Sequence, residues 1–330
     1  MKKVKARACS NIALVKYWGK RDTKLNLPAV ASISITLDSL FTETSVFFDQ
    51  KQTSDRLFLN GEKSTEKDRI RLSKFIDLIR KRAGVNDFAM VESINNFPTS
   101  AGLASSASSF ACLALAASRA AGLNMDNDEL SLFARIGSGS AARSVYGGFV
   151  EMKLGKREDG SDAVAHPLFS RDHWDLTVLI AITSEEKKKT GSTDGMELSR
   201  KTSPYYKPWV ESSADDIQDM RQAIKEKDFQ KVAEIAEFSC LKMHALALAS
   251  NPGLIYWNGT TVDLIHKVRE MRDMGIPVFF TIDAGPQLKA ICPSDYAAKV
   301  ESILLEQPGV KRVMKTPLGG DATILEEQDI

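Results

Sequence analysis

The chain has 330 residues, of which 43% are hydrophobic and 26% are charged, and its formal net charge is +1 at pH 7. This length suits two folded domains, and the composition is that of an ordinary soluble globular protein. A net charge this small provides no global field that would recruit nucleic acid or a membrane surface, so any anion site has to be local. No apolar run reaches membrane-spanning length and the four cysteines are scattered, which predicts a cytoplasmic protein with reduced thiols and no membrane partner.

The first half of the chain mixes strand and helix patterns. Apolar and polar side chains alternate over residues 31–37, which predicts a half-buried strand. A helix is expected to follow Thr65, which forms a capping-box pattern with Asp68, and to end at Gly84. The other elements expected in this half are strands at 42–49, 88–95, 146–154 and 176–182 and helices at 106–121 and 127–136.

Helical patterns dominate the second half. The charged stretch 185–189 is the expected junction, which gives an N-terminal domain at 1–184 and a C-terminal domain at 185–330. The expected elements are helices at 213–226, 228–249, 260–274 and 293–306 and strands at 277–283, 311–316 and 322–326. Because strands and helices do not alternate regularly, the pattern favours an α+β fold over a doubly wound sheet.

One segment points to a phosphate. Residues 98–107 read Pro-Thr-Ser-Ala-Gly-Leu-Ala-Ser-Ser-Ala and lead directly into an alanine-rich helix. The free N–H groups and the dipole at a helix start attract anions, Gly102 lets the backbone approach a phosphate, and Ser105 and Ser106 supply hydroxyl donors. The alternative is a serine-rich N-cap on an ordinary core helix.

A cluster of cations lies near the N-terminus. Within residues 11–21, Lys16, Lys20 and Arg21 surround a glycine, and Tyr17 adds a hydroxyl on a flat ring. Several cations beside a tight turn suit a polyanionic ligand. A solvated basic strand end is the alternative interpretation.

The segment 135–144 combines glycines, hydroxyls and arginine in the order Arg-Ile-Gly-Ser-Gly-Ser-Ala-Ala-Arg-Ser. Ser138 and Ser140 can donate to anionic oxygens, and the planar fork of Arg143 can bind both oxygens of a carboxylate. A plain glycine-serine loop without a ligand is the alternative.

Two segments of the second half add candidate functional groups. An apolar strand ends at Asp283 before a Gly-Pro turn, so a carboxylate on a rigid strand end could orient or deprotonate a hydroxyl. A turn-capping aspartate is the alternative there. Residues 187–196 place lysines beside Ser192 near the expected junction, where two domains would form a cleft, unless this segment is only a mobile surface loop. His244 shares a helical face with apolar residues and is expected to be a packed core histidine.

The order of these segments resembles the GHMP kinase superfamily, whose phosphate loop reads Pro-x-x-x-Gly-Leu-x-Ser-Ser-Ala. Within that superfamily the chain resembles the diphosphomevalonate decarboxylase family, because residues 11–20 match its Asn-Ile-Ala-x-x-Lys-Tyr-Trp-Gly-Lys. Further matches are Phe-Pro-Thr at 97–99, the segment 135–144, Tyr-Gly-Gly-Phe at 146–149 and Asp-Ala-Gly-Pro at 283–286.

The resemblance implies a fold and a reaction. The fold would be the two-domain α+β GHMP kinase fold, with a ribosomal-protein-like N-terminal domain, a ferredoxin-like C-terminal domain and the active site in the cleft between them. The reaction would convert (R)-5-diphosphomevalonate and ATP to isopentenyl diphosphate, ADP, phosphate and CO₂ in the mevalonate pathway. ATP and Mg²⁺ are the implied cofactors, and the metal would be held through the ATP phosphates, with Ser106 as a candidate protein ligand. A homodimer without a nucleic-acid partner is also implied.

The resemblance assigns roles to individual residues. Asp283 would orient or deprotonate the 3-hydroxyl, Arg143 would hold the carboxylate, and Lys20 would complete the catalytic set. The expected substrate-binding residues are Tyr17, Lys20, Ser138, Ser140, Arg143 and Ser192. The expected ATP-binding residues are Pro98, Ser100, Gly102, Leu103, Ala104, Ser105, Ser106 and Lys187.

The chain departs from the family pattern at two places. The family carries asparagine near Val30 and Ala31, where this chain is apolar. Some bacterial relatives have arginine at the position of Thr193, so one phosphate contact is either missing here or supplied by a lysine at 187–189. Two other functions stay open: a related kinase or decarboxylase that acts on mevalonate or phosphomevalonate, and a non-catalytic phospholigand- or RNA-binding protein. A sequence pI near 7.6 and the lack of a basic stripe weigh against nucleic acid.

Overall fold

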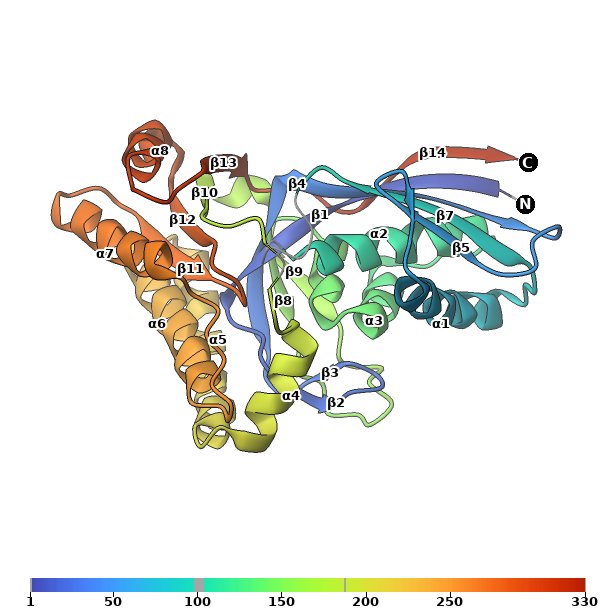
Figure 1. Cartoon of the computed structure of the whole chain (residues 1–330), viewed down its shortest axis with the longest axis horizontal. Helices are drawn as coiled ribbons and strands as arrows, with labels where there is room; N and C mark the ends of the chain where they lie inside the picture. Colours follow the sequence, from blue (N-terminus) through green and yellow to red (C-terminus); the bar gives the residue numbers. More distant parts are fainter. Residues whose placement is uncertain (1, 98–103, 187, 330) are drawn as a thin grey trace.

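A computed structural model of the chain describes residues 2–97, 104–186 and 188–329 (Figure 1). Its larger sheet has eight strands in the order β14-β1-β4-β7-β5-β6, and β8 and β9 extend it from β4. The strands of this sheet are β1 (Lys2–Val15), β4 (Ser32–Asp49), β5 (Arg56–Leu59), β6 (Glu62–Lys63), β7 (Phe88–Asn95), β8 (Phe149–Met152), β9 (Ala165–Phe169) and β14 (Thr323–Asp329). A small hairpin of β2 (Lys20–Asp22) and β3 (Leu27–Pro28) stands apart from it.

Three helices pack against the larger sheet: α1 (Glu66–Ala83), α2 (Ser105–Ala120) and α3 (Asn127–Gly137) (Figure 1). The predicted capping of α1 is confirmed, because the Thr65 hydroxyl accepts from the Asp68 N–H and Gly84 ends the helix at φ 69°. Helix α2 is rich in buried alanine, so its backbone lies close to β1 and β4. That close packing fixes the direction in which the first turn of α2 points.

The second sheet has the order β11-β12-β10-β13. Its strands are β10 (Leu176–Ile182), β11 (Phe279–Ile282), β12 (Leu288–Pro293) and β13 (Arg312–Pro317). One apolar cluster joins one face of this sheet to α7 (Gly259–Asp273) and α8 (Ala297–Leu305). A second cluster joins the other face to α5 (Tyr206–Glu226), α6 (Phe229–Leu248) and the C-terminal part of β1. This second cluster is a shared core, since it holds residues of both sheets.

The chain crosses between the two sheets more than once. Strand β10 pairs with β12 and β13, so the chain enters the second sheet before the junction expected near Glu185. Strand β14 pairs with β1 and returns the chain to the larger sheet. We therefore propose a first junction between β9 and β10, because a border after residue 184 separates β10 from its partners.

Some expected elements differ from the structure. The strands expected at 31–37 and 42–49 are one strand, β4, which continues through an irregularity where its register with β1 shifts between Cys9 and Ser10. The segment 187–196, for which a mobile surface loop was the alternative interpretation, contains the start of α4 (Ser192–Thr202). None of the helices in the described part of the chain combines the length and the apolar character that a membrane crossing needs.

Candidate active site

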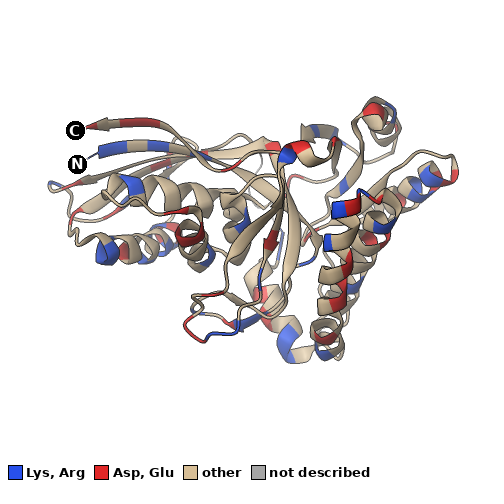
Figure 2. Ribbon diagram, turned by 180° about the vertical axis from the view of Figure 1, so that it is seen from behind, with Lys and Arg blue, Asp and Glu red and all other residues tan. Residues whose placement is uncertain are grey.

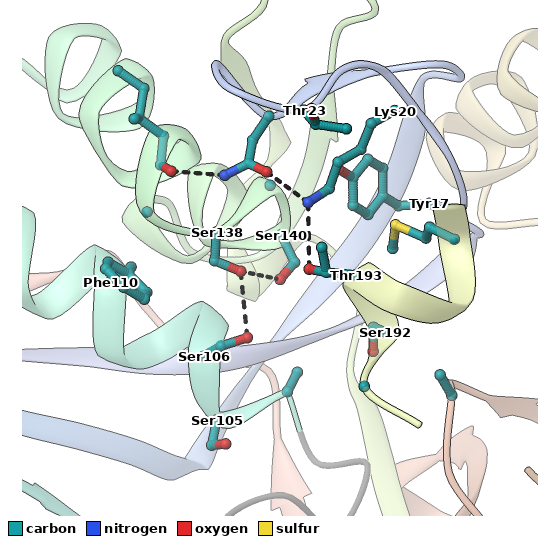
Figure 3. A pocket seen from close by; sticks show the side chains of 18 of the residues that line it. Tyr17, Lys20, Thr23, Ser105, Ser106, Phe110, Ser138, Ser140, Ser192 and Thr193 are labelled. Carbon is teal, nitrogen blue, oxygen red and sulfur yellow. Dashed lines mark hydrogen bonds between the residues drawn. The ribbon is translucent and has the colours of Figure 1, made fainter. Parts of the chain in front are cut away.

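A cavity of about 820 Å³ lies where both halves of the molecule meet. Its walls come from the end of β1, the β2–β3 hairpin, α1, the first turn of α2, the segment after α3, the start of α4 and the residues after β11. Figure 3 shows hydroxyl and lysine side chains from these elements pointing toward one another. The segments predicted from the sequence to carry the chemistry therefore converge, and Asp283, Lys20, Ser106 and Arg143 all line this cavity.

Asp283 is the first residue after β11, whose side chains are fully buried. Its carboxylate accepts a hydrogen bond of 2.7 Å from the ammonium group of Lys16, which directly follows β1. The Lys16 side chain is 1% exposed, whereas that of Asp283 is 25% exposed and reaches the cavity. Burial raises the pKa of Asp283, but the charges of Lys16 and Lys289 outweigh it and the pKa is lowered overall. The aspartate is thus an ionised group at the cavity wall.

Arg143 is buried and held by three side chains of the larger sheet. It donates to the hydroxyls of Ser34 at 3.0 Å and Ser32 at 2.6 Å and to the side-chain oxygen of Asn11 at 3.1 Å. These serines lie on the polar face of the predicted alternation in β4, so that face holds the arginine. Burial lowers the pKa of Arg143 to about 10, which leaves it positively charged at neutral pH. Three of its five N–H groups make these bonds, so the guanidinium is oriented while it lines the cavity.

Tyr17 brings a buried hydroxyl to the cavity. Among the described residues this hydroxyl has no hydrogen-bond partner, and burial raises its pKa, so it stays protonated. A Cβ on Gly139 would lie 2.3 Å from that oxygen, so only glycine allows the close approach. An unpaired buried donor at a cavity wall is typical of a group that bonds to a ligand.

A row of hydroxyls connects two segments that the sequence separates. Ser106, in the first turn of α2, lies 3.3 Å from Ser138, and Ser138 lies 3.4 Å from Ser140 (Figure 3). Lys20 faces the same space and donates to Asn26 at 2.6 Å and to Thr193 at 3.4 Å. Burial lowers the pKa of Lys20. Because the bonds between the hydroxyls are long, these groups are free to reorient toward a ligand.

The expected phosphate loop is described only in part. Ala104, Ser105 and Ser106 line the cavity, and the first turn of α2 opens into it. Pro98, Ser100, Gly102, Leu103 and Lys187 were also expected to bind ATP, and they lie outside the described residues. The first turn of a helix is a favourable place for a phosphate, because its N–H groups are directed toward the ligand.

Lys188 joins the second half of the molecule to the cavity. Its ammonium group donates to the Ser192 hydroxyl at 2.8 Å and to the Ala284 carbonyl at 3.1 Å. Burial lowers its pKa, and the charge of Asp283 opposes that shift. Of the lysines at 187–189 considered as a phosphate contact, Lys188 therefore lies beside Ser192 and next to the aspartate.

Sequence reasoning missed three cations of α1. Lys67, Arg71 and Lys74 line the cavity, and Arg71 donates to the Gly137 carbonyl at 2.8 Å. The guanidinium carbon of Arg71 also lies 4.5 Å from the centre of the Phe110 ring. The available signal is their spacing of four and three residues, which places them on one helix face.

Two further groups lie near Asp283, and only the first of them was expected from the sequence. His244 is packed as expected: its ring nitrogen lies 3.2 Å from the Ile282 carbonyl, and its ring centre lies 4.6 Å from that of Trp257. Burial lowers its pKa to about 3, so it is neutral. Lys289, on β12, was not identified from the sequence, because a lysine within an apolar strand pattern gives no sign of what it faces.

Comparisons with known proteins agree with this architecture. A family model for the diphosphomevalonate decarboxylase-like N-terminal domain matches residues 8–165, and one for the mevalonate 5-diphosphate decarboxylase C-terminal domain matches residues 178–321. The human diphosphomevalonate decarboxylase is 40% identical over 88% of this chain and 76% of its own length.

Solved structures are similar over almost the whole chain. The crystal structure of mevalonate diphosphate decarboxylase from Staphylococcus aureus has a TM-score of 0.93 and 39% identity, covering 99% of each chain. A structure described as MDDEF in complex with MVAPP, AMPPCP and magnesium has a TM-score of 0.92 and 37% identity, covering 99% of this chain and all of the other. The fold is thus the two-domain α+β fold of the GHMP kinase superfamily. Within that class, the chain belongs to the diphosphomevalonate decarboxylase family.

Proposed function

We infer that the chain catalyses the ATP-dependent decarboxylation of (R)-5-diphosphomevalonate to isopentenyl diphosphate, ADP, phosphate and CO₂, a step of the mevalonate pathway. The observation that carries this inference is the position of Asp283, an ionised carboxylate that shares one cavity with Arg143, Lys20 and the first turn of α2. Relatives that bear the decarboxylase name match most of the chain.

Asp283 would act on the tertiary 3-hydroxyl of the substrate. An ionised carboxylate can accept the hydroxyl proton while the oxygen attacks the terminal phosphoryl group of ATP, which leaves ADP. The bond between the substrate carbon chain and its carboxylate then breaks, and the electron pair of that bond forms the alkene. At the same time the bond between C3 and the oxygen of the newly attached phosphate breaks. CO₂ and phosphate leave, so atoms and electrons balance. Lys16 supports this role, since its ammonium group fixes the carboxylate from the side.

The other residues would hold anionic groups of the two substrates. We assign Arg143 to the substrate carboxylate, and we assign Tyr17, Ser138, Ser140, Ser192 and Lys20 to the diphosphate. Ser105 and Ser106, with the N–H groups of α2, would bind phosphates of ATP. Two observations support this division: Arg143 and Asp283 affect each other's pKa, and the hydroxyl row of Ser140, Ser138 and Ser106 reaches the first turn of α2.

Magnesium would reach this site with ATP. Among the described residues, no group of three or more histidine, cysteine, aspartate or glutamate side chains is placed to hold a metal ion. The hydroxyl-rich wall near Ser106 suits a metal whose other ligands are phosphate oxygens and water. When bound, the ion would neutralise charge on the phosphoryl group that is transferred.

Assembly, location and nucleic-acid binding stay predictions. We propose a cytoplasmic homodimer on the basis of the resemblance alone. Lys and Arg residues are interspersed with Asp and Glu over the ribbon (Figure 2), an arrangement that does not favour a polyanion such as RNA. A filter-binding assay at physiological salt checks this, and we expect no retained RNA.

The function is tested by offering the purified chain ATP, Mg²⁺ and, separately, mevalonate, phosphomevalonate and diphosphomevalonate. We expect CO₂ and phosphate in equal amounts from the diphosphate and neither from the other two. The Asp283→Ala variant is the control, and it should bind ATP but release no CO₂. Phosphorylation without CO₂ would instead favour a related kinase, and CO₂ from phosphomevalonate would move the substrate preference.

A further inference from the structure

Two lysines interact with Asp283 without lining the cavity. Lys16 and Lys289 are 1% and 2% exposed, and the cavity wall is made by other described residues. Lys16 is bonded directly to the carboxylate, and Lys289 interacts with it electrostatically. The described site thus contains a fully buried cation, Lys289, to which the proposed reaction has assigned no role.

The register of the second sheet shows where Lys289 lies. It pairs with Thr281 of β11, two residues before Asp283, and alternates with the apolar Leu288 and Ala290 that face α7 and α8. Cross-strand partners share one face of a sheet. The Thr281 hydroxyl donates to the Ala13 carbonyl of β1 at 3.1 Å, so this face is directed toward β1. Lys289 therefore lies between the two sheets, on the side from which Lys16 reaches Asp283.

We propose that Lys289 is a positioning residue, whose buried charge acts together with Lys16 on the Asp283 carboxylate and gains further negative charge nearby when the anionic substrate enters the cavity. This inference rests on the proposed function, because it takes Asp283 as the proton acceptor. It also takes as the ligand diphosphomevalonate, which carries a diphosphate and a carboxylate. It adds a residue that acts through Asp283 and touches neither substrate.

The charges around Lys289 are uneven. Asp283 is the anion that faces it, while Lys16 and Lys188 are cations on neighbouring segments. Two groups of α6 also face this region, but the pKa of Cys240 is raised to about 11 and that of His244 is lowered to about 3, so both are neutral near pH 8. Burial, only partly opposed by Asp283, lowers the pKa of Lys289 to about 8. Among the described residues around Lys289, cations therefore outnumber anions, and a bound ligand would add negative charge.

Substrate binding should therefore be linked to proton uptake. Negative charge brought close to Lys289 favours its protonated form and raises its pKa. Near pH 8 only part of the free protein carries this proton, so binding would take up a fraction of a proton at this site. At pH 6 Lys289 is protonated in both states, and its contribution to uptake disappears.

The first test is calorimetric titration of the wild-type chain with diphosphomevalonate, in buffers of different ionisation enthalpy at pH 8 and pH 6. Lys289→Met removes both the charge and the titration, whereas Lys289→Arg keeps a charge that does not titrate. We expect both variants to take up less proton than the wild type at pH 8 and to equal it at pH 6. Equal uptake in wild type and Lys289→Met at pH 8 would overturn the inference.

The second test separates charge from packing through the pH profile of kcat/KM. Without the Lys289 charge, the pKa of Asp283 should rise, so the acid limb of Lys289→Met should move to higher pH. Lys289→Arg should keep the wild-type limb. A uniform loss at every pH, with no displacement of the limb, would show a packing role and contradict the proposal.

Folding is controlled by thermal unfolding of every variant. Replacement of a buried charge by an apolar side chain of similar length is usually tolerated. Lys289→Gln is a second neutral variant and is expected to behave like Lys289→Met in both tests. The outcomes also separate the two ideas: a wild-type chain that neither binds nor converts diphosphomevalonate contradicts the proposed function, whereas normal binding without a Lys289-dependent proton contradicts only this inference.

Discussion

The two walls of the cavity are built on different principles. Around Asp283 the side chains are buried and bonded to one another, with Lys16 paired to the carboxylate and Arg143 held by three partners. Along the wall that carries the hydroxyl row, Ser106, Ser138 and Ser140 are joined by long bonds. The side chains around Asp283 are therefore already ordered before a ligand binds, whereas the hydroxyl row keeps hydrogen-bond donors available for the ligand.

The largest effect is expected from removing the charge at the organised wall. Asp283→Asn keeps the size of the side chain but cannot accept the hydroxyl proton, so kcat should fall by about 100- to 10,000-fold. ATP affinity should change little, which equilibrium binding of a fluorescent nucleotide analogue checks. In this variant Lys16 loses the negative charge of its partner, although the amide oxygen can still accept its hydrogen bond, so thermal unfolding is the control. Turnover at the wild-type rate would remove Asp283 from the mechanism.

Arg143 should give the next largest effect. Arg143→Ala leaves Ser32, Ser34 and Asn11 without their donor and the substrate carboxylate without its partner, so kcat/KM should fall by an amount equivalent to about 2 to 5 kcal/mol. Arg143→Lys keeps the charge but loses the planar fork, and it should recover only part of the loss. Steady-state kinetics of both variants decide this, and full recovery with lysine would mean that two-point geometry is unimportant.

The third prediction concerns His244, which is packed near Asp283, and the pH dependence of folding stability. Its pKa is about 3 in the folded chain and about 6.5 when exposed, so the unfolded chain binds the extra proton as pH falls below 6.5. Folded-state stability is therefore lost over that window, by about 2 kcal/mol at pH 5 relative to pH 7. Urea unfolding at both pH values should show this loss reduced in His244→Gln. A loss in His244→Gln equal to that of the wild type would contradict the assignment.

Tyr17→Phe should give the smallest effects, and these should have opposite signs for folding stability and for substrate binding. Tyr17→Phe removes a buried hydroxyl that lacks a partner among the described residues, so the free protein should be unchanged or more stable by about 1 kcal/mol. Substrate binding should weaken by about 0.5 to 1.5 kcal/mol, because the phenol would donate to the ligand. Thermal unfolding with and without substrate measures both. A variant that binds as well as the wild type would show that the hydroxyl stays unpaired in the complex.

The sequence predicted elements whose signals are local. The cap at Thr65, the end of α1 at Gly84 and the buried strand at 176–182 match the structure because each depends on neighbouring residues. The order of the motifs also predicted that Asp283 and Arg143 share one cavity, and both residues line it. Their individual roles stay predictions.

Long-range relations lay beyond the sequence patterns. The pair of Lys16 and Asp283 joins residues 267 positions apart, and nothing in either local segment indicates the partner. The assignment of 176–182 to the second sheet depends on β12 and β13, which follow more than a hundred residues later. Lys289 was missed for the same reason, since its charge has meaning only beside β1 and β11.

The pairing of β14 with β1 affects how the chain is made. Residues 2–7 are bonded across to residues 323–329, and both ends lie side by side at one extremity of the molecule (Figure 1). On a ribosome, β1 emerges before its partner strand β14 has been translated. Until then an open strand edge is exposed, where another chain could pair with it. Pairing of β14 with β1 should therefore remove this exposed edge.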